Sequence, residues 1–172
     1  DWDPGHWLDT AEVMTALAIG YDWMYDYLSQ ETKDIVTDAL INKGLRTAEG
    51  QKWYNVDYNW NQVCNAGLVC AALAVYEHCP ALAQEVIDDA IRTNKVAVEG
   101  IYGPDGAYPE GPTYWHFGTI YQVLLLTAME NALGTDFGLS QAPGFLETGT
   151  FKIFSTGTTG KAFNFADNVL GA

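Results

Sequence analysis

Hydrophobic residues recur at helical spacing through most of the chain, in segments that turns separate. Residues 8–28 place apolar side chains three or four positions apart, which predicts a helix with one buried face. Ser29 can cap a second helix that extends to residue 43, and Gly44 is a natural terminator for it. The pattern therefore predicts a helical hairpin in the first quarter of the chain.

Two further buried helices follow, and the first of them opens a similar hairpin. Residues 60–78 are apolar almost all round, which predicts a helix buried on every side. Pro80 can open the next helix, over residues 81–98, whose polar positions predict one solvent-exposed face. A further helix is predicted over residues 114–133, with Gly134 behind it. Buried helices thus alternate with more polar ones.

The spacing of these elements indicates a repeat. Trp7 and Asn59 are 52 residues apart, and Asn59 and Tyr114 are 55 residues apart. Repeats of this length are typical of stacked helical hairpins. If the stack curves, the buried helices form an inner ring and the polar helices an outer ring. We therefore predict an all-α fold, an incomplete (α/α) toroid of about three hairpins, with a straight solenoid as the alternative that spacing leaves open.

The pattern changes after Pro143. Residues 150–155 and 161–165 predict short β-type segments around glycines. We therefore divide the chain into a toroid portion over residues 1–149 and, over residues 150–172, the start of a β-rich segment or a linker to a β-sandwich.

Composition narrows the classes of function. The net charge of −14, from 22 acidic and 8 basic residues, argues against nucleic acid as a partner because it leaves no basic patch. No apolar run reaches the roughly 18–20 residues of a membrane span, so no membrane partner is expected. Three cysteines predict free thiols, and three scattered histidines predict neither a metal site nor a cofactor. Aromatic residues make up 13% of the chain, as carbohydrate-binding clefts require.

Polar and aromatic residues cluster at the start of each predicted buried helix, at residues 6–9, 59–62 and 110–116. Because buried helices in such a stack run the same way, we expect the three clusters to meet at one end. The long loops 50–58 and 100–112 lead into the second and third clusters, and active sites are commonly built from such loops on a rigid frame. Helix N-termini also favour bound anions. This end of the stack is therefore the predicted active site.

Each of these residues also has a structural interpretation, which the sequence leaves open. Asn59 and Asn61 are suitable helix caps, His6 suits a packed imidazole, and Tyr114 suits the core. Tyr114 follows a rigid Pro-Glu-Gly-Pro turn and precedes His116 by two residues, a setting that favours a functional role.

Long motifs in the chain resemble heparinase II/III-like proteins. They are HWLDTAE at residues 6–12, GYDW at 20–23, NWNQVCN at 59–65 and PEGPTYW at 109–115, with a similar tail at 157–167. The resemblance covers nearly the whole chain. It implies an (α/α) toroid followed by β-sandwich domains, and β-elimination of uronic-acid polysaccharides. It also implies a periplasmic or secreted protein.

The resemblance assigns roles to individual residues. Tyr114 matches the catalytic tyrosine, which acts as base and acid, and Asn59 matches the asparagine that neutralises the uronate carboxylate. Several relatives carry a histidine directly after that asparagine, where this chain has Trp60. His116, His6 or a histidine from a further domain is expected to replace it. The full set of expected substrate-binding residues is His6, Trp7, Trp60, Asn61, Gln62, Glu110 and Trp115.

The expected partners are a polysaccharide substrate and the remaining domains of the parent chain. Three hairpins are fewer than a full toroid, so this part alone is expected to be inactive. The acidic charge makes densely sulfated heparin a poor substrate and favours a less charged uronate glycan, glycosaminoglycan or alginate-like. Two rival functions stay open. A glycoside hydrolase would use Asp57 and Glu110 as paired carboxylates, and a non-catalytic glycan-binding protein would use Trp7, Trp60 and Trp115.

Overall fold

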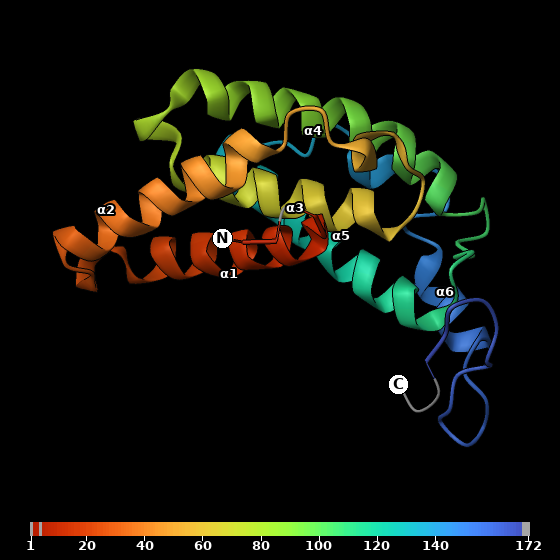
Figure 1. The fold of residues 1–172 in the computed structure, drawn as a ribbon. Coiled ribbons are helices and arrows are strands. Elements are labelled where there is room, and N and C mark those ends of the chain that lie inside the picture. The colour runs from red at the N-terminus through yellow and green to blue at the C-terminus, as the bar shows by residue number, and fades with distance from the viewer. Residues whose placement is uncertain (1, 4, 170–172) are drawn as a thin grey trace.

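The computed structural model describes residues 2–3 and 5–169, and it is built almost entirely of helices (Figure 1). The helices are α1 (Trp7–Met24), α2 (Gln30–Ala39), α3 (Asn59–Ala74), α4 (Pro80–Ile101), α5 (Pro112–Leu133) and α6 (Thr148–Phe154). Short 3-10 turns join them, and a π-helical turn (Leu40–Gly44) extends α2. The isolated antiparallel bridge between Thr156 and Ala162 is the one β pairing in the part of the chain that the structure describes. The prediction of an all-α fold is confirmed.

Helix α3 lies at the centre, with α1, α4 and α5 packed around it (Figure 1). Helices α1, α3 and α5 run in one direction. Helices α2 and α4, which follow α1 and α3 in the sequence, run in the opposite direction. Gly67 brings α1 and α3 close together, since a Cβ at this position would lie 2.5 Å from the Ala11 carbonyl oxygen. These helices form stacked helical hairpins, and the curvature of the stack into a toroid stays a prediction.

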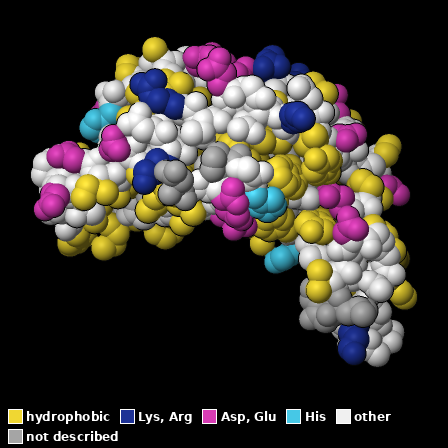
Figure 2. Space-filling view, viewed as in Figure 1, with side chains coloured by type: hydrophobic (Ala, Val, Ile, Leu, Met, Phe, Trp, Pro, Cys, Tyr) yellow, Lys and Arg dark blue, Asp and Glu magenta, His cyan; other side chains and the backbone are white. Residues whose placement is uncertain are grey.

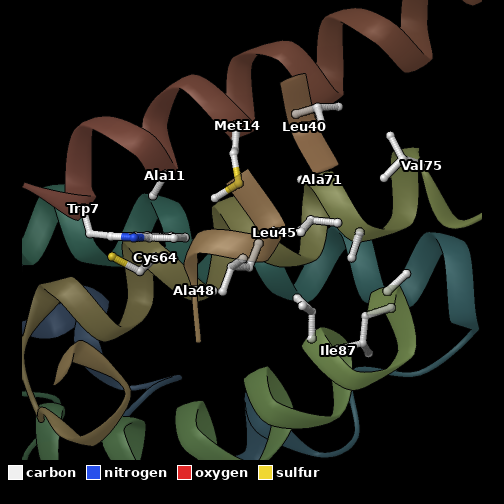
Figure 3. Packing of buried hydrophobic residues seen from close by; sticks show 14 of the residues in the cluster. Trp7, Ala11, Met14, Leu40, Leu45, Ala48, Cys64, Ala71, Val75 and Ile87 are labelled. Atoms are coloured by element: carbon white, nitrogen blue, oxygen red, sulfur yellow. The ribbon is translucent and has the colours of Figure 1, made fainter. Parts of the chain in front are cut away.

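The main core forms between α1, α3, α4 and the segment that follows α2 (Figure 3). Trp7 and Met14 of α1 point toward Cys64 and Leu45, and all four side chains are almost fully buried. Each large apolar side chain buried in this way contributes about 1.5–3 kcal/mol. The three cysteines are free thiols, as predicted, and burial raises the pKa of the Cys70 thiol to about 11.

Local signals in the sequence set several helix ends. The Ser29 hydroxyl accepts a hydrogen bond from the Thr32 N–H at 3.1 Å and caps α2. Pro80 occupies the first turn of α4, where its missing N–H costs nothing. Gly134 ends α5 in the left-handed conformation, with a φ of 74°. These three predictions are confirmed.

Gly44 has a different role from the one predicted. Its φ is −105°, so it is not a left-handed terminator, and the helix continues through it as a π-helical turn. A Cβ at this position would lie 2.5 Å from the Met14 sulfur. Glycine is therefore needed here for close packing against α1.

The predicted β-type segments at residues 150–155 and 161–165 are wrong, because the first forms most of α6 and the second contributes only the isolated bridge. Tertiary contacts explain the helix. The Thr148 hydroxyl donates to the Gly106 carbonyl at 2.7 Å and accepts from the Trp115 indole N–H at 2.7 Å. These bonds fix the start of α6 against α5, and packing overrides the β propensity of the local sequence. The domain division at residue 149 stays a prediction, and residues 170–172 lie outside the described part.

Buried amides join α3, α4 and α5. Asn94 of α4 donates to Asn61 at 3.2 Å and to Gln122 at 3.0 Å, and it accepts from Gln122 at 2.8 Å. Asn65 and Thr93 complete the cluster. Since every member is fully or almost fully buried, each polar group depends on the others for its hydrogen bonds.

Replacing Asn94 with leucine is expected to lower the free energy of unfolding by about 2–4 kcal/mol. The change removes partners from Asn61 and Gln122, and each buried polar group left without a partner costs about 1–3 kcal/mol. Urea denaturation followed by circular dichroism measures the loss. Asn42→Leu is the control, since Asn42 is exposed and bonds only to the exposed Asp38. Equal stability of both variants would show that the amide cluster contributes nothing.

Candidate active site

The three clusters singled out in the sequence meet at one end of the molecule, where α1, α3 and α5 begin. The His6 ring, just before α1, lies edge-on against Trp60 of α3, with ring centroids 5.1 Å apart and an angle of 88°. Glu110, just before α5, bonds to Asn59 at the start of α3. Since His6 and Glu110 each reach the first turn of α3, the expectation that the helix starts converge is confirmed.

Asn59 holds a carboxylate at the N-terminus of α3. Its backbone N–H donates to one oxygen of Glu110 at 2.8 Å, and its side-chain Nδ2 donates to the other at 2.7 Å. The partial positive charge of the helix N-terminus favours this anion further. Asn59 is only 2% exposed, and its Oδ1 has no hydrogen-bond partner among the described residues. The carboxamide is thus closed off in this conformation, with both donors aimed at one carboxylate.

Tyr114 lies in the first turn of α5. Gly118 follows one turn later on the same face of α5. A Cβ at Gly118 would lie 3.3 Å from the Asn59 Cβ, so this face of α5 is turned toward the start of α3. Tyr114 is half-buried and packs against the core cluster that contains Tyr102 and Tyr108. Among the described residues, no hydrogen-bond partner is recorded for its hydroxyl.

Buried polar side chains form hydrogen bonds one turn along α3 from Asn59, and they support this end of the helix. The Tyr108 hydroxyl donates to the Gln62 Oε1 at 2.7 Å, and the Gln62 Nε2 donates to the Tyr102 hydroxyl at 2.9 Å. Burial, followed by the nearby Glu110 carboxylate, raises the pKa of Tyr108 far above its ordinary value. Tyr108 therefore stays a protonated donor and fixes the loop that carries Glu110.

Three residues expected to bind substrate are buried instead. Trp7 is 1% exposed and packs against Trp53, with ring centroids 5.1 Å apart, so neither face of its ring is open to a sugar. Asn61 donates to the Tyr54 carbonyl and belongs to the amide cluster. Gln62 is fully buried between two tyrosines. All three side chains serve the interior in this structure, and their assignment to substrate binding stays a prediction.

Trp115 and His116 lie in the first turns of α5, but the structure does not bring either side chain to Asn59. The Trp115 indole bonds to Thr148 and its ring packs against Phe151, so this side chain anchors α6. His116 is exposed and two residues from Gly118, which places it on the opposite side of α5. The structure therefore does not bring His116 to Asn59. His6, which touches Trp60, is the histidine that it places at this end.

Asp57 and Glu110, the carboxylates expected of a hydrolase, face different surroundings. Asp57 is exposed and packs against Gly100 near the end of α4, where it lines a cavity of about 360 Å³ with Arg92. Glu110 is bound to Asn59 and does not line that cavity. The two carboxylates therefore have different partners in this structure.

Asn168 supports the candidate site, although no pattern in the sequence predicts this role. Its Oδ1 accepts from the Thr113 N–H at 3.1 Å and from the Thr113 hydroxyl at 2.8 Å. Thr113 precedes Tyr114, so Asn168 completes the hydrogen bonds of the turn that carries the phenol. Residues 113 and 168 are 55 positions apart, and only the folded chain reveals such a cap.

A second concave region lies between the other ends of α1, α3 and α5. It has a volume of about 310 Å³, is lined mainly by apolar side chains such as Leu73 and Leu124, and contains none of the predicted site residues.

Within residues 2–3 and 5–169 no helix is long and apolar enough to cross a membrane. No group of three or more metal-ligating side chains occurs in the same residues. No protein-family model matches the sequence, and no curated protein matches it.

Proposed function

We propose that this chain is part of an (α/α) toroid lyase that cleaves uronic-acid-containing polysaccharides by β-elimination. One observation carries the proposal: Asn59 holds a carboxylate with two N–H donors at a helix N-terminus. Tyr114 lies in the first turn of α5, one turn before Gly118, which faces Asn59. A uronate carboxylate has the same charge and the same pair of oxygens as the Glu110 carboxylate that occupies this place. The sequence motifs that resemble heparinase II/III-like proteins include both Asn59 and Tyr114.

The arrangement suggests how the reaction proceeds. The two donors of Asn59 neutralise the substrate carboxylate, which makes the C5 proton of the uronate more acidic. Tyr114, as the phenolate, removes this proton, and the electron pair forms a double bond between C4 and C5 as the bond from C4 to the glycosidic oxygen breaks. The leaving oxygen takes the proton back from Tyr114. His6 and Trp60 lie next to Asn59 and are placed to contact the sugar ring.

Charge narrows the substrate. Figure 2 shows acidic groups along the α4 edge and at the α2 end, and it also shows acidic groups in the middle of this face, beside a histidine. Because exposed charges are screened beyond about 8 Å at physiological ionic strength, the outer acids repel a substrate at the inner helices only weakly. A net charge of −14 still opposes a densely sulfated chain. The proposed substrate class is therefore a uronate glycan with little sulfation. By the same resemblance to heparinase II/III-like proteins, we propose that the protein acts in the periplasm or outside the cell, together with the remaining domains of its parent chain.

The full-length protein, incubated with a panel of uronate polysaccharides, is expected to produce ultraviolet absorbance from the new C4–C5 double bond. The carboxyl-reduced form of the same polysaccharide is the matched control, and it is expected to give no signal because it lacks the group that Asn59 binds. New reducing ends without absorbance would favour the hydrolase. Binding without either signal would favour a glycan-binding protein.

A further inference from the structure

We propose that Glu110 is an internal competitor for the substrate carboxylate, and that the ligand which displaces it is a carboxylate with a neighbouring hydroxyl group. This inference rests on the proposed function, because it concerns how the same site opens. It assigns Glu110 a regulatory role in place of direct substrate binding.

The closed state follows from the hydrogen bonds of Glu110. Its two oxygens take the backbone N–H and the Nδ2 of Asn59, at 2.8 Å and 2.7 Å. Asn59 is 98% buried in this state, so an external carboxylate cannot reach the same donors while Glu110 is in place. The Glu110 carboxylate and a ligand carboxylate cannot bind Asn59 at the same time. The competition with Glu110 therefore lowers the affinity of any ligand that binds Asn59.

Glu110 satisfies Asn59 incompletely. The Asn59 Oδ1 is buried and has no donor within the described residues. A carboxylate offers no hydrogen to such an acceptor, so the closed state retains an unsatisfied polar atom, which is unfavourable. Oδ1 and Nδ2 belong to one planar carboxamide, so a ligand group that reaches Nδ2 lies next to Oδ1. A ligand with both a carboxylate and a hydroxyl can satisfy all three Asn59 atoms, which gives it an advantage over Glu110.

The movement that opens the site is confined to one side chain. The loop before Glu110 is fixed by Tyr108, whose hydroxyl bonds to Gln62. The helix after it is fixed at Thr113 by Asn168. Gly111 has a φ of 88°, and a Cβ there would lie 2.7 Å from the Phe165 carbonyl oxygen. Since the backbone is held on both sides, the half-buried Glu110 side chain is the part free to rotate away.

The test is a titration of the ¹⁵N-labelled full-length protein with sodium D-glucuronate, following the backbone and side-chain amide resonances of Asn59. In Glu110→Ala, which removes the carboxylate and leaves no side-chain group to pair with Asn59, half-saturation is expected at a glucuronate concentration at least tenfold lower than in the wild type. Glu99→Ala is the matched control, because Glu99 is exposed on α4, and it is expected to behave as the wild type. Acetate, which lacks the hydroxyls, is expected to bind more weakly than glucuronate, and glucose is expected to cause no shift.

Equal affinity of glucuronate for the wild type and Glu110→Ala would overturn the competition, and equal affinity of the wild type for acetate and glucuronate would overturn the role of the hydroxyl. If Glu110→Ala does not fold, the titration of the wild type decides. Shifts of Asn59 with glucuronate that disappear on adding a tenfold excess of glucose would contradict a carboxylate site, as would no shift at saturating glucuronate. The readout does not depend on catalysis, so binding of glucuronate without lyase activity would refute the proposed reaction alone.

Discussion

Replacing Tyr114 with phenylalanine is expected to lower the rate of double-bond formation by the full-length protein about 10²- to 10⁴-fold, the range that general acid–base catalysis contributes. The variant keeps the ring, which packs against the second core cluster, and loses only the hydroxyl. No hydrogen bond of that hydroxyl is found among the described residues, so its removal leaves no buried partner unsatisfied. We therefore expect kcat to fall while stability stays near that of the wild type.

Tyr121→Phe is the matched control for Tyr114→Phe. Tyr121 lies two turns further along α5, is also partly buried and packs against Phe117 with ring centroids 5.4 Å apart. Because Tyr121 lies two turns from the start of α5, Tyr121→Phe is expected to leave the rate of double-bond formation unchanged. Initial rates measured by ultraviolet absorbance at saturating substrate compare the two variants. A Tyr114→Phe protein with wild-type activity, or an equal loss in both variants, would rule out Tyr114 as the base.

Replacing Gly67 with alanine is expected to destabilise the fold by about 3 kcal/mol, near the upper end for overpacking. The added Cβ would lie 2.5 Å from the carbonyl oxygen and 2.8 Å from the Cα of Ala11. These are backbone atoms of α1, so a rotamer change cannot relieve the clash and the two helices must separate. The separation disrupts the packing of Met14 and its neighbours. The midpoint of urea denaturation measures the loss.

Gly20→Ala provides a control with the same chemical change. Gly20 is exposed on α1, and a Cβ there meets no atom within 4 Å. The substitution should stabilise the protein by roughly 0.5–1 kcal/mol, because alanine has the higher helix propensity. The two variants should therefore shift the midpoint in opposite directions. A loss of stability in Gly20→Ala equal to that in Gly67→Ala would mean that close packing of α1 and α3 is not the cause.

Periodicity predicted the helices well because each one buries a continuous apolar stripe. The region 60–78, apolar almost all round, became the central helix α3, and the more polar region 81–98 became α4 on the outside. The predicted hairpin turns at Ser29 and Pro80 also hold, since capping depends only on neighbouring residues. Curvature of the stack into a toroid depends on small rotations between hairpins, which periodicity does not encode.

The site was predicted less completely, and the reasons are physical. Asn61 and Gln62 belong to a helix that the sequence already indicated to be buried on every side, so no solvent-facing position was available to them. That signal was sufficient to predict the burial of both. The burial of Trp7 could not be predicted, because it depends on Trp53, which comes from a short 3-10 turn in a loop. The pairing of Glu110 with Asn59 likewise joins residues 51 positions apart.

The bond from Asn168 to Thr113 also has a consequence for the order in which the protein assembles during synthesis. Ribosomes add roughly 5–20 residues per second, so the 55 residues between these two partners take about 3–11 s to make. Over that interval α1, α2 and α4 can already pack with α3, whereas the first turn of α5 still lacks its cap. The turn that bears Tyr114 is therefore among the last parts to be fixed. A nascent chain that has formed its core does not yet have the complete candidate site.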